Sequence, residues 1–143
     1  MHSVRMKVLL VFLPILFVAG AMMAQVPVFQ QVGTLHEVML GIVKPTSDII
    51  FQFQNDPPKT AADWALLQNA ALTLGETGNL LLLPGRAKDT GDWTKFSKAM
   101  VDAGSATFKA ANAKDAKALS DAGDKVYDTC ENCHTKYLPK PAQ

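Results

Sequence analysis

Segments with the periodicity of amphipathic helices fill most of this chain, and they constrain its fold more than any other feature. Breaks rich in proline, glycine and asparagine separate them, at Asp56-Pro57-Pro58, Pro84-Gly85, Thr90-Gly91 and residues 112–115. The four segments between these breaks have about 20 residues each, and none shows the alternation of a strand. Most connections are short, which is typical of antiparallel neighbours. The sequence therefore predicts an all-α fold, an antiparallel four-helix bundle.

The predicted helices cover residues 34–54, 60–83, 92–111 and 115–137. Each has apolar side chains at spacings of three and four, which gives it one face for the core. In the first helix the predicted buried face consists of Leu35, Met39, Ile42, Thr46, Ile49 and Phe53. Pro45 interrupts this helix, and its ring would press on the carbonyl of Gly41, so we expect a kink there.

The second predicted helix carries two further local signals. Thr60, with Asp63 three residues later, predicts a capping box at its start. Gly75 and Gly78 lack side chains and would let another backbone, or a flat ligand, come close to this helix. The first signal predicts where the helix begins, and the second predicts a close neighbour along it.

The first 24 residues differ from the rest of the chain. His2, Arg5 and Lys7 form a basic start, residues 8–18 are almost wholly apolar, and small residues follow. This is the layout of a secretory signal peptide, with cleavage between Ala21 and Ala24. An uncleaved membrane anchor is the alternative, but a span needs about 18 apolar residues and this core has about 11. We therefore predict a signal peptide over residues 1–24, one exported domain over residues 25–143, and no membrane span after cleavage.

Charge and cysteine content narrow the function classes. Cleavage after residue 24 removes Arg5 and Lys7 from 14 basic residues, against 13 acidic ones, so the mature chain carries a net charge of about −1. No basic patch remains that would indicate a nucleic-acid partner. Export would place the only two cysteines in an oxidising compartment, where they require a chemical explanation.

Both cysteines belong to the sequence Cys130-Glu131-Asn132-Cys133-His134, a C-x-x-C-H motif near the end of the last predicted helix. Cysteines three residues apart on a helix project to the same side, so that both thiols can add to the vinyl groups of one haem. His134 lies one turn beyond Cys130 and could place an imidazole nitrogen on the iron. The motif predicts one covalent haem c, with Cys130 and Cys133 as attachment sites and His134 as the proximal iron ligand.

Three other interpretations of the cysteine pair were weighed. A structural disulfide would staple a helical binding module without haem. A zinc site would need more ligands, and only His2 and His36 remain elsewhere in the chain. A redox dithiol usually lies at a helix N-terminus, where its pKa is lowered, whereas these cysteines come late in a helix.

With this motif at the end of the last of four helices, the chain resembles the class II c-type cytochromes, the cytochrome c′ and cytochrome c556 group. The resemblance covers about residues 35–138, and Tyr137 matches the aromatic residue that follows the histidine in that family. Leu138 stands where cytochrome c′ often has a basic residue. The resemblance implies a four-helix bundle in the periplasm, and it also allows a homodimer. It further implies that the first helix supplies the group opposite the proximal histidine.

Since the resemblance implies a distal ligand from the first helix, Met39 is the predicted distal iron ligand, because it lies on the expected buried face of that helix. A thioether ligand raises the reduction potential and completes a six-coordinate haem for electron transfer. The alternative is that Met39 only fills the core, which methionine does well. His36, one turn earlier, could give bis-histidine ligation instead, and Met100 on the third helix is more typical of core.

The predicted function is one-electron transfer between exported or membrane-bound redox partner proteins, which the sequence does not identify. We predict that the protein is not an enzyme, because the sequence shows no nucleophile–base pair and no acidic metal cluster. The main alternative is a five-coordinate haem protein that binds nitric oxide or carbon monoxide. Arg86 could pair with a haem propionate or lie solvated in a loop. Lys114, Lys117 and Lys125 are predicted to form a solvated face that could dock an acidic partner.

Overall fold

The computed structural model describes residues 29–138, and every regular element in this part of the chain is a helix. In chain order the elements are α1 (Leu35–Val38), the π-helical turn η1 (Met39–Val43), α2 (Lys44–Asn55), α3 (Ala61–Leu81), α4 (Asp92–Ala113) and α5 (Ala116–Tyr137). Elements α1, η1 and α2 follow one another without a gap, and we call them the first helical segment (residues 35–55). The predicted all-α fold with four helices is therefore confirmed, with helix ends within about two residues of the predicted ones.

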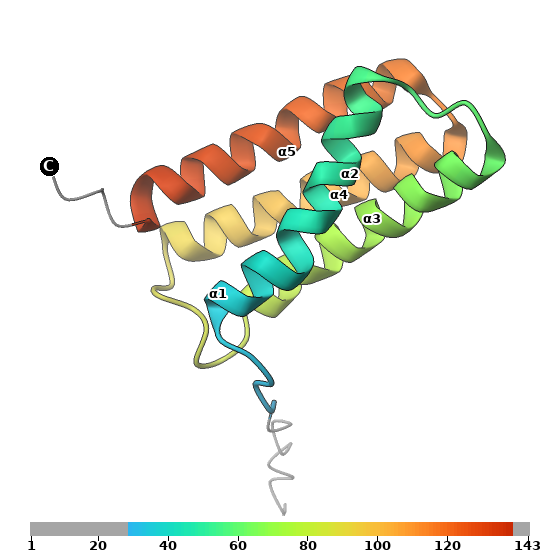
Figure 1. Cartoon of the computed structure of the whole chain (residues 1–143). Coiled ribbons are helices and arrows are strands. Elements are labelled where there is room, and N and C mark those ends of the chain that lie inside the picture. The colour runs from blue at the N-terminus through green and yellow to red at the C-terminus, as the bar shows by residue number, and fades with distance from the viewer. Residues whose placement is uncertain (1–28, 139–143) are drawn as a thin grey trace, which may run out of the picture.

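The helices pack as a bundle with one segment laid across the others. Helices α3, α4 and α5 run antiparallel to their chain neighbours, and the first helical segment crosses them at a steep angle (Figure 1). Contacts are most extensive between α3 and α4, followed by α4 and α5. The first helical segment is held by contacts with α3 and α5. It can therefore form one wall of a space whose other walls are α4 and α5.

Capping boxes fix the beginnings of two helices. The Thr60 hydroxyl accepts a hydrogen bond from the Asp63 backbone N–H at 3.1 Å, and the Asp63 carboxylate accepts one from the Thr60 N–H at 2.8 Å. The predicted capping box is thus confirmed. Thr34 and Glu37 form the same arrangement before α1. Each box satisfies backbone N–H groups that lack a partner within the helix.

A π-helical turn occupies the position where the sequence predicts a kink. The Lys44 N–H donates to the carbonyl of Met39, five residues back rather than four. Pro45, which follows directly, has no N–H to donate and lies in the first turn of α2. The wider turn gives the proline ring room beside the carbonyl of Gly41, so the crowding is relieved by an extra residue in the turn.

The buried face of the first helical segment is displaced from the predicted one. Only Phe53 of the predicted stripe is fully buried, while the other members are half-buried. The fully buried positions of the segment also include Val38, Val43, Ser47 and Ile50. A regular spacing of 3.6 residues does not hold across a π-helical turn, which rotates the faces before and after it relative to each other. In the other three helices, the apolar spacing predicts core positions that are all buried or half-buried: Trp64, Leu67, Ala71 and Leu74 in α3, Trp93, Phe96, Met100, Ala103 and Thr107 in α4, and Leu119, Gly123, Val126, Cys130, Cys133 and Tyr137 in α5.

Two glycines allow α3 and α4 to touch backbone to backbone. A Cβ on Gly104 would lie 2.5 Å from the Cα of Gly75 and 3.1 Å from the carbonyl oxygen of Ala71. We expect Gly104→Ala to lower the free energy of unfolding by about 1–3 kcal/mol, because the helices must separate. Urea unfolding followed by circular dichroism measures this. Gly41→Ala is the control, since a Cβ there meets nothing within 4 Å; equal losses in both variants would contradict the explanation.

The sequence also predicts no membrane span after cleavage and a signal peptide at the N-terminus. No helix within residues 29–138 is both long and apolar enough to cross a bilayer. The predicted signal peptide, residues 1–24, lies outside the described residues, and so does its cleavage site. The domain predicted over residues 25–143 is described over residues 29–138.

Candidate functional site

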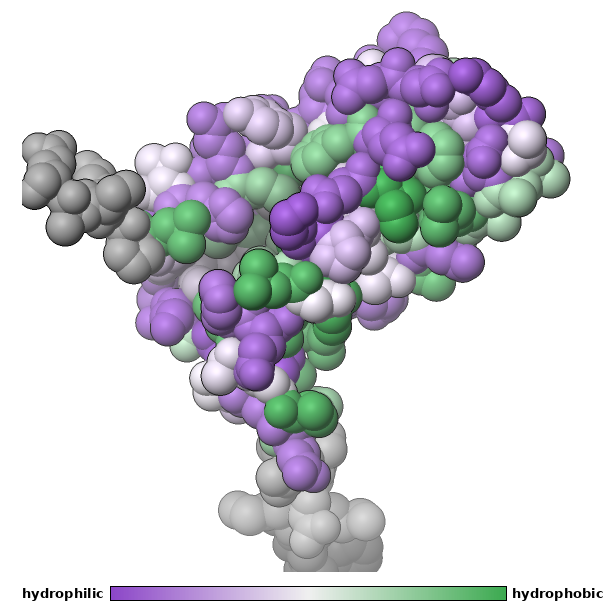
Figure 2. Space-filling view, viewed as in Figure 1, coloured by the Kyte–Doolittle hydropathy of each residue, from purple (hydrophilic) through white to green (hydrophobic). Residues whose placement is uncertain are grey.

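A cavity of about 350 Å³ lies between the first helical segment and the adjoining halves of α4 and α5. Its lining is almost entirely apolar, and its volume falls within the range of small-molecule and cofactor sites. The surface in Figure 2 is hollowed beside the first helical segment, on the side that faces the C-terminal half of α5. Exposed Leu40 and Tyr127, with 56% and 57% of their surface accessible, lie at the cavity. The cavity therefore opens to solvent, and the exposed residues of its lining also include Lys44 and His134.

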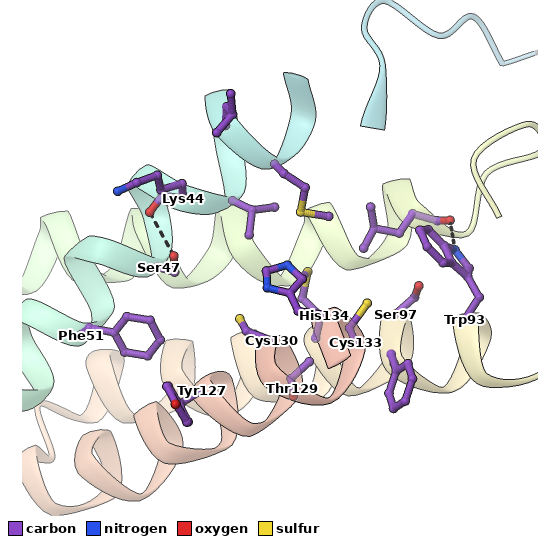
Figure 3. Close-up of a pocket in the computed structure, with 16 residues that line it drawn as sticks. Lys44, Ser47, Phe51, Trp93, Ser97, Tyr127, Thr129, Cys130, Cys133 and His134 are labelled. Atoms are coloured by element: carbon purple, nitrogen blue, oxygen red, sulfur yellow. Dashed lines mark hydrogen bonds between the residues drawn. The ribbon is translucent and has the colours of Figure 1, made fainter. Parts of the chain in front are cut away.

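Helix α5 contributes Cys130, Cys133 and His134 to one wall. Figure 3 shows both sulfur atoms and the imidazole directed into the same space below the first helical segment. Both cysteines are half-buried free thiols, whereas His134 is exposed. The structure thus brings together all three residues that the motif singled out. Their spacing on a regular helix is sufficient to do so.

The thiols are not of the activated kind. Burial raises the pKa of Cys130, and the neighbouring Cys133 raises it further. Burial also raises the pKa of Cys133. Both groups are therefore neutral at physiological pH, whereas a redox dithiol or a catalytic cysteine needs a lowered pKa.

The first helical segment forms the wall that faces α5. Met39, half-buried in η1, lines the cavity together with Leu40 and Val43. The predicted distal ligand is thus on the same cavity as His134. His36 is exposed and does not contribute to the lining. Of the two candidates on this segment, the structure places only Met39 where a group bound to His134 could meet it.

Aromatic side chains close the two ends of the cavity. Phe51 and Tyr127 lie at one end, with their rings edge to face and the centroids 6.4 Å apart. Trp93 and Phe96 lie at the other end, and the Trp93 indole N–H donates to the Leu81 carbonyl at 2.7 Å. Figure 3 shows Phe51 with Tyr127 and Trp93 on opposite sides of His134. Met100, expected in the core, is buried and also lines the cavity.

Ser97 places an unpaired hydroxyl in this lining. Its side chain is 2% exposed, and within residues 29–138 its Oγ has no hydrogen-bond partner. Leaving a buried hydroxyl without a partner costs about 1–3 kcal/mol. A polar atom of a bound molecule would remove this cost. The unpaired Oγ is therefore an independent sign that the cavity accommodates a ligand with polar as well as apolar atoms.

Other residues singled out in the sequence lie away from the cavity. The Arg86 guanidinium donates to the backbone carbonyls of Leu80 at 3.5 Å and Gly33 at 3.4 Å. It joins the α3–α4 loop to the chain before α1, and no position in the cavity lining belongs to it. Lys117 pairs with Asp121 at 2.9 Å, and Lys114 and Lys125 are exposed like it, as predicted for a solvated face.

A cluster that the sequence did not reveal joins the end of α5 to the beginning of α4. One carboxylate oxygen of Asp89 accepts hydrogen bonds from the backbone N–H groups of Gly91 at 2.8 Å and Trp93 at 3.0 Å. Its other oxygen accepts one from the Tyr137 hydroxyl. Lys136 forms an ion pair with Asp92 beside it. We call Asp89 and Tyr137, with the bond between them, the Asp89–Tyr137 clasp.

The clasp has a predicted pH signature. Partial burial and the hydrogen bond to Asp89 raise the pKa of Tyr137 to about 12. The protonated phenol therefore contributes its full stabilisation below the ordinary tyrosine pKa of about 10, and this contribution is lost as the pH rises through about 12. The bond from Tyr137, followed by that from the Trp93 N–H, lowers the pKa of Asp89, so its contribution is lost only as the pH falls through that lowered pKa.

Titration of ¹³Cζ-labelled tyrosine by NMR measures this effect. We expect a midpoint of about 12 for Tyr137 in the wild-type protein. Asp89→Asn should lower this midpoint towards 10, because it removes the negative charge beside the phenol. Tyr137→Phe assigns the resonance. An unchanged midpoint in Asp89→Asn would show that the carboxylate does not hold the phenol.

Within residues 29–138, no three histidine, cysteine, aspartate or glutamate side chains group closely enough to hold a metal ion by themselves. Comparison of the chain with protein-family models, with curated proteins and with solved structures gives no match.

Proposed function

We propose that this chain is an exported one-electron carrier with a single haem attached covalently to Cys130 and Cys133. One observation carries the proposal: two free thiols and an imidazole from α5 line the same apolar cavity as a thioether from the first helical segment. On this proposal the chain is a periplasmic c-type cytochrome of the class II kind, and not an enzyme. The proposal rests on the motif and on the cavity around it.

The residues of the cavity fit such a group. The cysteine sulfurs would hold its edge through thioether bonds, and the apolar side chains would keep water from its faces. The unpaired hydroxyl of Ser97 offers a hydrogen bond inside a lining that is mostly apolar. When bound, the haem supplies an iron that alternates between Fe(II) and Fe(III). The open side of the cavity, to which exposed Leu40 and Tyr127 contribute, would leave a route for an electron to a partner protein.

His134 and Met39 would hold the iron. The imidazole comes from the last turn of α5 and the thioether from η1, so each ligand belongs to a different wall of the cavity. Ligands that stay bound in both oxidation states keep the rearrangement at each transfer small. Methionine ligation also favours the reduced state relative to a second histidine.

Haem stain and absorption spectra test the proposal. The protein should be made in a host that matures c-type cytochromes, then denatured and separated by electrophoresis. Only covalently attached haem survives this treatment and stains the band. A colourless protein with its bare peptide mass would reject the proposal and would favour a helical module stapled through Cys130 and Cys133.

A second candidate function is binding of nitric oxide or carbon monoxide. Leu40 and Val43 flank Met39 on the same wall, so a haem that Met39 fails to reach would face an apolar pocket open to small gases. Carbon monoxide added to the reduced protein separates the two functions. A rapid spectral shift supports gas binding, whereas an unchanged low-spin spectrum with a methionine–iron charge-transfer band supports electron transfer.

A further inference from the structure

The proposed iron ligand on α5 lies in the last turn of that helix. Helix α5 ends at Tyr137, and the Leu138 N–H closes its last turn with a hydrogen bond of 3.0 Å to the His134 carbonyl. Terminal turns fray more readily than helix interiors. The imidazole itself is exposed. Its orientation therefore depends on whatever holds the final turn in place.

The contacts of Asp89 and Tyr137 hold this turn from outside the cavity. Asp89 accepts two backbone N–H groups at the beginning of α4 with one oxygen, and the Tyr137 hydroxyl with the other. The Tyr137 ring packs edge to face against Trp93, at a centroid distance of 5.1 Å, and against Phe96, at 6.3 Å. Trp93 and Phe96 line the cavity, whereas Asp89 and Tyr137 do not. One carboxylate thus joins the turn of His134 to the cavity wall on α4.

We propose that Asp89, acting through Tyr137, is a positioning residue that fixes the last turn of α5 and thereby the direction of the His134 imidazole towards the iron. This inference rests on the proposed function. The clasp keeps the last turn of α5 from fraying, because it anchors this turn to the beginning of α4. A ligand held in one orientation before the cofactor arrives needs no ordering when the bond to iron forms.

The neighbouring ion pair between Lys136 and Asp92 joins the same two helices but is a weaker means of fixing the turn. About half of each side-chain surface is exposed, 48% for Lys136 and 45% for Asp92. Exposed ion pairs of this kind contribute little to stability and are screened by salt. The pair therefore offers a matched control: Lys136→Met removes a contact between the same elements and keeps the bond between Asp89 and Tyr137. It also removes the Lys136 ammonium 5.9 Å from the centre of the Tyr137 ring, so it sets an upper limit for effects that do not depend on that bond.

Tyr137→Phe tests the inference, because it removes the hydroxyl and keeps the ring that packs on Trp93 and Phe96. In the purified haem protein we expect the low-spin EPR signal to broaden or split, as the imidazole takes more than one orientation. We also expect the Leu138 amide to exchange its hydrogen about tenfold faster, since a bond to a charged group is lost. Asp89→Ala should give the same two changes, and the double variant should give no more than either single one.

Each outcome has a distinct meaning. A Tyr137→Phe protein with wild-type EPR and exchange rates overturns the inference and leaves the haem proposal intact. So does a Lys136→Met control that changes the EPR signal as much as Tyr137→Phe does, because the effect then belongs to the helix end in general. Intact mass, recorded first, reports the proposed function separately: a chain without haem rejects that function, and the role of the clasp towards iron with it.

Discussion

Replacing both Cys130 and Cys133 by alanine is expected to remove all covalently bound haem from the protein. The two sulfurs lie in the wall of one cavity and are the only cysteines of the chain, so no other thiol can take their place. The measurement is haem stain on a denaturing gel, compared with an immunoblot of the same band. Because the stain is read on denatured protein, the result does not depend on whether the variant folds.

Asn132→Ala is the matched control for this experiment. Asn132 is exposed and lies between the two cysteines, so its replacement keeps the spacing of the motif and the cavity unchanged. This variant should stain like the wild-type protein. Haem stain that persists in the double cysteine variant would contradict covalent attachment at Cys130 and Cys133.

Met39→Ala is expected to convert a low-spin six-coordinate haem into a high-spin one that binds carbon monoxide. Alanine is too short to reach across the cavity from η1, so the iron would lose its thioether ligand while His134 stays in place. The methionine–iron charge-transfer band should disappear, and the reduction potential should fall. Absorption spectra of the oxidised protein and a carbon monoxide titration of the reduced protein measure these effects.

Met100→Leu is the control, because Met100 also lines the cavity but comes from α4, next to α5. Leucine preserves most of its volume, so the core should remain packed. If Met100→Leu removes the charge-transfer band and Met39→Ala does not, the distal ligand is Met100 and the assignment of Met39 is wrong. If neither variant changes the spectrum, neither thioether is bound to the iron.

Local signals in the sequence were enough to predict the helices and one wall of the cavity. Capping at Thr60, and apolar spacing in α3, α4 and α5, depend on residues within one or two turns of each other. The position of Cys130, Cys133 and His134 on one side of α5 likewise follows from helical spacing alone. Glycines 75 and 78 could be expected to meet a backbone, although the sequence did not say which one.

Features that depend on distant residues, or on an irregular turn, were not predictable in this way. The π-helical turn displaced the buried face of the first helical segment, since a regular period carries no information about an inserted residue. Phe51 and Ser97 were missed as lining residues for want of a local motif. The contact of Asp89 with Tyr137 spans 48 positions in the chain, and an aspartate in a polar loop carries no sign of its partner.

The close approach of α3 to α4 at Gly78 has a consequence for the dimensions of the cavity. A Cβ at Gly78 would lie 2.9 Å from the carbonyl oxygen of Ser97 and 2.7 Å from a methyl carbon of Val101. Ser97 and Leu81, three residues beyond Gly78, both line the cavity. An added methyl group on Gly78 would push α3 and α4 apart and so widen the cavity beside Ser97 and Leu81. Gly78, which does not line the cavity, therefore limits the width of the molecule that the cavity can hold.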